Sequence, residues 1–228
     1  MPPRIGTDVV TPNHPERALV LTYAGERRAA LAALLALDDA LAALLRTTSE
    51  PALGQMRLAW WREALERLDT APAPAEPVLR ALAAEVLPLG VTGASLVPIV
   101  HGWEVLVEEE HLEADALRRF GEGRGTLFVA AGRALGAMGD PLLKAGRGWA
   151  LADLAGNLSA PEEAAEVRAQ ARPLLASATQ ARWSPGGRAL GAMAHLARMD
   201  LALPDGTLPP IGSPRRVGRL LWHRLTGR

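Results

Sequence analysis

The sequence predicts an all-α protein, a single-domain helical bundle of about eight to ten helices. Of its 228 residues, 49% are hydrophobic, mostly Ala and Leu, whereas strand formers are scarce, with one Tyr, two Phe and few Val and Ile. Apolar residues recur with helical spacing along the chain, and Pro and Gly separate the helical segments. We find neither a repeat of fixed period nor a second domain boundary, so residues 1–228 are expected to form one domain.

The first helices can be placed from these Pro and Gly positions. We expect helices over 15–24 and 26–46, the second long and rich in Ala and Leu. A third begins at Ser49 or Glu50 and ends near Leu68, with Pro51 in its first turn, where a missing N–H is harmless. Three prolines then make 69–77 a stiff linker, since each Pro fixes its own φ and disfavours helix before it.

The rest of the chain repeats this pattern up to a short basic helix at the end. A second linker, 203–214, holds four Pro and two Gly, and the final helix is expected over 214–226. The intervening helices are expected over 78–87, 94–110, 113–135, 141–158, 161–183 and 185–203.

Composition excludes several classes of function. The formal net charge is zero, which removes bulk attraction to nucleic acid, and the lack of Cys removes disulfides and thiolate chemistry. The start of the chain has no signal-peptide pattern, and no segment reaches the roughly 18 apolar residues of a membrane span. We therefore expect a cytoplasmic protein, with peripheral contact at the inner membrane as an alternative.

Two acidic residues, Asp38 and Asp39, interrupt the apolar helix 26–46. A carboxylate is costly to bury unless a cation or hydrogen bonds compensate it. Carboxylates spaced i, i+4 on a helix can hold Mg²⁺ against a diphosphate, but Ala42 and Ala43 occupy the positions four residues on. The alternative is a polar helix edge with two solvated or Arg-paired aspartates, and Arg57 is a candidate partner.

The adjacent residues Trp60 and Trp61 are candidates for lining a ligand cavity. Adjacent helical residues cannot both face one pocket, so we expect one in the core and the other at a helix–helix contact. The acidic run from Glu104 to Asp115 is interpreted as a solvated face rather than a metal site.

Together, several motifs resemble the squalene/phytoene synthase family. They are the Arg-containing start of the 26–46 helix, Ser-Glu-Pro-x-Leu-Gly, Arg-Leu-x-Trp-Trp-Arg-x-Ala-Leu, the His-Gly-x-Glu and Leu-Glu-Ala-Asp blocks, and Gly-Trp-Ala-Leu-Ala-Asp-Leu. The resemblance implies the all-α isoprenoid synthase fold, in which active members bind prenyl diphosphates through Mg²⁺ and two aspartate-rich motifs. It also makes Arg28, Arg57, Trp60 and Trp61 candidates for ligand binding, with Asn157 beside the second motif.

The departures from the family pattern concern its acidic residues. Ala42 stands where the first motif has its second Asp, and Leu106 occupies a further acidic position unless Glu104 or Glu108 substitutes. The second motif falls near Gly156 and Asn157, and Asp153 lies about one turn early. Because Mg²⁺ needs several oxygen ligands, we expect no metal and no cofactor. Asp38, Asp39 and Asp153 are remnants of a catalytic site, and Mg²⁺ would bind only if the protein is an active enzyme.

The C-terminal segment 214–228 combines an apolar face with five Arg. That pattern suits a helix lying on an anionic membrane, and it also suits a terminal helix docked on the domain with a solvated basic face.

These observations define three hypotheses. The first is a catalytically degenerate relative of the squalene/phytoene synthases, resembling the branch that includes a complex I assembly factor. It would bind an isoprenoid or a protein partner. The second is an active prenyltransferase of isoprenoid biosynthesis, and the third is a peripheral membrane protein that binds lipid.

Overall fold

The computed structural model describes residues 15–48, 50–204 and 207–228. Ser49 and part of the predicted 203–214 linker lie outside these residues, as does the beginning of the chain. The described residues form ten α-helices and no strand, which confirms the all-α fold class. The helices are α1 (Pro15–Thr22), α2 (Arg28–Thr47), α3 (Pro51–Arg67), α4 (Pro77–Glu85), α5 (Val97–Glu108), α6 (Ala114–Ala134), α7 (Leu142–Asn157), α8 (Pro161–Gln180), α9 (Arg188–Asp200) and α10 (Pro214–Thr226).

Most helix ends agree with the Pro and Gly positions, and the start of α9 shows why one does not. The sequence predicts a helix from 185, but α9 begins at Arg188. Asp140 holds the preceding turn, because its carboxylate accepts hydrogen bonds from the Ser184 backbone N–H at 2.9 Å and hydroxyl at 2.7 Å. The Ser184 carbonyl in turn accepts from the Gly187 N–H. A tertiary contact therefore delays the helix.

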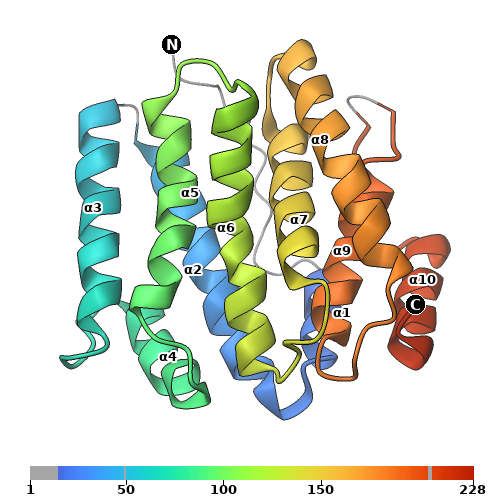
Figure 1. Cartoon of the computed structure of the whole chain (residues 1–228), viewed down its shortest axis with the longest axis horizontal. Coiled ribbons are helices and arrows are strands. Elements are labelled where there is room, and N and C mark those ends of the chain that lie inside the picture. The colour runs from blue at the N-terminus through green and yellow to red at the C-terminus, as the bar shows by residue number, and fades with distance from the viewer. Residues whose placement is uncertain (1–14, 49, 205–206) are drawn as a thin grey trace.

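Helices α3, α5, α6, α7 and α8 lie side by side, and α2, α1 and α9 pack behind them (Figure 1). Helix α4 lies below α5 and packs against α2, and α10 lies at the edge opposite α3. The core lies between these layers. Leu31, Leu34, Leu37 and Leu41 give α2 a fully buried stripe, and α2 packs against α6, which contributes Phe120 and Phe128 to the same core. The layered arrangement places α2 behind the centre of the front layer.

Glycines bring α6 unusually close to both of its neighbours. A Cβ on Gly123 would lie 2.6 Å from the backbone nitrogen of Gly102 on α5. Two residues on, and on nearly the opposite face of α6, a Cβ on Gly125 would lie 2.7 Å from the backbone nitrogen of Arg147 on α7. These approaches are possible only without a Cβ, so the segment 121–125 serves helix packing.

Within the described residues, no single helix has the length and apolar character of a membrane span. One pair of helical segments, Pro77–Leu89 and Ala94–Glu108, has this length and apolar character when the two are taken together, but the pair is bent by 106° at the break between them.

Candidate functional site

Asp38 is buried in the middle of α2, within the leucine stripe, and its charge is fully compensated. Its two carboxylate oxygens accept from the Arg124 guanidinium, Oδ1 from Nε at 2.8 Å and Oδ2 from Nη2 at 2.7 Å. The indole Nε1–H of Trp103 donates a third hydrogen bond to Oδ1 at 3.0 Å. Such a bidentate, charge-assisted pair is the arrangement that makes a buried carboxylate tolerable.

Arg124 extends the pair into a bridge between two helices. Its Nη1 donates to Asp153 Oδ2 on α7 at 2.5 Å, so one guanidinium joins the carboxylates of α2 and α7. The guanidinium lies over the rings of Trp103 and Trp149, whose centroids are 4.4 and 4.5 Å from its central carbon. Cation–π contacts of this kind stabilise a desolvated cation by up to about 2 kcal/mol.

Burial by itself would lower the pKa of Arg124, but the charges of Asp153 and Asp38 and their hydrogen bonds outweigh it and raise the pKa. The guanidinium is therefore a fixed positive charge. Its position follows from the glycine contacts, since Gly123 and Gly125 flank it and let α5 and α7 bring Trp103 and Trp149 against it.

We call Asp38, Arg124, Asp153, Trp103 and Trp149 the arginine bridge. Its two carboxylates, Asp38 and Asp153, are two of the three acids that the sequence marks as candidate remnants of a catalytic site, and the third, Asp39, lies outside it. They do not fit Mg²⁺, because both oxygens of Asp38 already accept from Arg124 and a fixed cation lies between the two acids. Mg²⁺ prefers near-octahedral oxygen coordination, and a guanidinium in that position repels it. The described residues contain no group of three His, Cys or acidic side chains placed to hold a metal ion.

Two arginines that the sequence singles out, Arg57 as a partner of the aspartates and Arg28 as a ligand-binding candidate, lie away from Asp38. Arg57 does not neutralise Asp38 or Asp39, because it is exposed and its Nη1 donates to Thr48 Oγ1 at 2.8 Å. Asp39 instead pairs with Arg17 on α1 at 2.7 Å. Arg28 is exposed at the first residue of α2, about 15 Å along the helix from Asp38.

The two adjacent tryptophans point in different directions. Trp61 is buried in the core, whereas Trp60 is 45% exposed beside the 69–77 linker, where it lines a surface pocket with Pro72 and Pro74. Neither belongs to the arginine bridge, which uses Trp103 and Trp149 instead.

Three other positions that the sequence compares with the family motifs, Glu104, Leu106 and Asn157, make their contacts outside the bridge. Glu104 pairs with Arg62 on α3 at 3.0 Å, and Leu106 is buried in the core. Asn157, at the end of α7, donates from its amide to the backbone carbonyl of Asp153 at 2.8 Å. None of the three brings a carboxylate toward Asp38.

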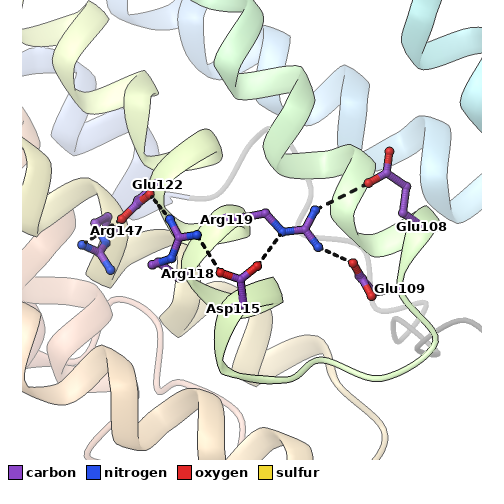
Figure 2. Close-up of polar contacts among 7 residues, drawn as sticks. All are labelled: Glu108, Glu109, Asp115, Arg118, Arg119, Glu122 and Arg147. Carbon is purple, nitrogen blue, oxygen red and sulfur yellow. Dashed lines mark hydrogen bonds and ion pairs between the residues drawn. The ribbon is translucent and has the colours of Figure 1, made fainter.

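The acidic run near the end of α5 forms a charge network with arginines of α6 and α7 (Figure 2). Arg119 lies at its centre and contacts Glu108 at 3.7 Å, Glu109, and Asp115 at 3.2 Å. Exposed ion pairs of this kind each contribute little to the free energy of unfolding. Here they connect the end of α5 to the start of α6. The members are Glu108, Glu109, Asp115, Arg118, Arg119, Glu122 and Arg147.

Arg124 is not among the site residues that the sequence predicts, although a signal for it exists. It stands four residues after Phe120 and four before Phe128, on the buried stripe of α6. A cation at such a position requires a buried anion, and Asp38 is the buried acid of α2.

The all-helical architecture of the described residues is consistent with an isoprenoid synthase-like fold. The sequence model of squalene/phytoene synthase matches residues 17–126, which include α2, α3, α5 and the Arg124 turn of α6. Over these residues, just under half of its length, the chain is similar to the squalene/phytoene synthase family. No curated protein and no solved structure matches it significantly.

Proposed function

We propose that this chain is a catalytically degenerate squalene/phytoene synthase-like protein. In this proposal it acts as an isoprenoid-binding or assembly protein rather than as a prenyltransferase. The observation that carries the proposal is the arginine bridge, in which Arg124 lies where the carboxylates of α2 and α7 face each other. A diphosphate substrate needs divalent cations at that place, and there a guanidinium already occupies both oxygens of Asp38 and one of Asp153.

The missing acids support the same conclusion. Ala42 follows Asp38 at i+4 and Leu106 is buried and apolar, while Glu104 and Glu108 pair with Arg62 and Arg119. Each replacement removes an oxygen ligand, and no other carboxylate of the described residues takes its place. What the chain retains is the helical framework, held together at its centre by an ion pair.

Direct assays separate this role from the enzymatic alternative. The protein is incubated with Mg²⁺ and farnesyl or geranylgeranyl diphosphate, and release of inorganic diphosphate is followed. We expect no release above a heat-treated control. Binding of farnesol, which carries the chain without the diphosphate, is then measured with and without EDTA.

Farnesol binding that EDTA leaves unchanged supports an isoprenoid-binding role, and absence of farnesol binding with no turnover leaves the assembly role. Mg²⁺-dependent diphosphate release that Asp153→Asn abolishes would show an active prenyltransferase and refute the proposal.

A further inference from the structure

The terminal helix α10 presents two opposite faces, one docked on the protein and one facing solvent. The docked face carries Arg216, Leu220 and His223, all buried. The outer face carries Leu221, Trp222 and Leu225, which are 48%, 58% and 80% exposed. The sequence left open whether this helix docks on the domain or lies on a membrane. In the structure the helix is docked, and it still exposes an apolar face to solvent.

The docked face is held by strong contacts. Arg216 forms a bidentate pair with buried Glu16 of α1, at 2.7 and 2.8 Å, and a further bond to Asp200. The carbonyl of Gly227 accepts from the Trp183 backbone N–H at 2.8 Å. These contacts fix the rotation of α10, so Leu221, Trp222 and Leu225 cannot turn into the core.

The outer face has the charge distribution of a lipid-binding helix. At 100° per residue, its three apolar side chains span an arc of about 100°, with Arg215 about 20° beyond one edge and Arg224 about 60° beyond the other. Both arginines are exposed, as is Arg228. The segment 207–228 contains five Arg and no acidic residue, although the whole chain is neutral.

We propose that the outer face of α10 docks on an anionic lipid bilayer, with Leu221, Trp222 and Leu225 inserted at the headgroup level and the flanking arginines contacting lipid phosphates. An apolar arc bordered by cations is the pattern of interfacial helices. The three side chains expose roughly 400 Å², about half of the 800 Å² that each partner buries in a specific protein interface. A bilayer needs no larger complementary surface, and the charges of the segment select an anionic one.

Vesicle co-sedimentation tests this inference. The full chain is mixed with vesicles of phosphatidylcholine alone or with 30% phosphatidylglycerol, in 50 or 500 mM NaCl. Each arginine near an anionic surface strengthens binding about fivefold, so two of them predict at least about 25-fold tighter binding to the anionic vesicles, weakened by salt. Arg215→Gln, which removes one of the two flanking arginines, should lose about fivefold.

The decisive variant combines Leu221→Gln, Trp222→Gln and Leu225→Gln, which leaves the docked face intact. Its matched control combines Met56→Gln and Leu143→Gln, which remove exposed apolar side chains from α3 and α7. All proteins are first checked for equal melting temperatures. We expect the triple variant to lose vesicle binding more than tenfold and the control to keep it.

Three results would overturn the inference. They are failure of the native chain to bind anionic vesicles, equal binding by the triple variant, and a dimer in analytical ultracentrifugation that the triple variant dissolves. The last result would assign the face to a second copy of the chain. None of them depends on whether the arginine bridge excludes metal.

Discussion

Replacement of Arg124 by Met is the perturbation that the structure makes most informative. Arg124 and Asp38 are 4% and 5% exposed, and the substitution leaves Asp38 with only the Trp103 indole as a hydrogen-bond donor among the members of the bridge. Removing one partner of a buried ion pair costs about 3–5 kcal/mol, because the other charge stays buried and uncompensated. For a protein of this size, that corresponds to a fall in melting temperature of about 6–20 °C.

The assay is urea unfolding followed by far-UV circular dichroism at pH 7.5, in a double-mutant cycle with Asp38→Leu. The double variant Arg124→Met with Asp38→Leu should recover most of the lost stability, since it leaves no unpaired charge. Asp153→Asn serves as the comparison and should cost only about 1 kcal/mol, because the Asp153 side chain is 36% exposed and solvent screens its charge. A cost below 1 kcal/mol for Arg124→Met, or no recovery in the double variant, would refute the assignment of a buried, energetically coupled pair.

Two further predictions concern helix packing and pH. Gly123→Ala should cost about 2–3 kcal/mol, because its Cβ would meet the Gly102 backbone at 2.6 Å, whereas Gly156→Ala, with no atom within 4 Å, should be neutral or stabilising in the same unfolding assay. Burial lowers the pKa of His195 to about 3 and that of His223 to about 4, so both rings are neutral in the folded protein. Their contribution to stability is complete above pH 6.5, where the unfolded chain is also neutral, and is lost as the pH falls toward 4 and then 3. Between pH 6.5 and 5 the loss is up to about 2 kcal/mol for each histidine, and unfolding curves for the native chain and His195→Gln should differ in this slope. A slope that is equal in the two proteins would contradict the assignment to His195.

The fold could be predicted from sequence because its determinants are local. Ala and Leu periodicity with Pro at helix starts places helices such as α2 and α10 to within two residues, since helix ends depend on neighbours along the chain. The predicted start of α9 lies three residues before the observed one, because the start depends on Asp140, which is distant in sequence.

The candidate site was predictable only in part, for the same reason. The burial of an acid in α2 is visible in the sequence, but its partner lies 86 residues away and no local pattern names it. Arg57 is closer to Asp38 in the sequence, but its prediction as the partner is wrong, because its side chain contacts Thr48 instead. The role of Gly123 and Gly125 in packing depends on contacts with α5 and α7, which no local pattern specifies.

The central claim is that an internal arginine has taken the place of the divalent cations, and calorimetry tests it most directly. The native chain is titrated with farnesyl thiodiphosphate, a non-hydrolysable substrate analogue, in 5 mM Mg²⁺ and again in EDTA. We predict no Mg²⁺-dependent heat, because Asp38 and Asp153 are held by Arg124. Micromolar binding that appears only with Mg²⁺ and is lost in Asp153→Asn would contradict the account.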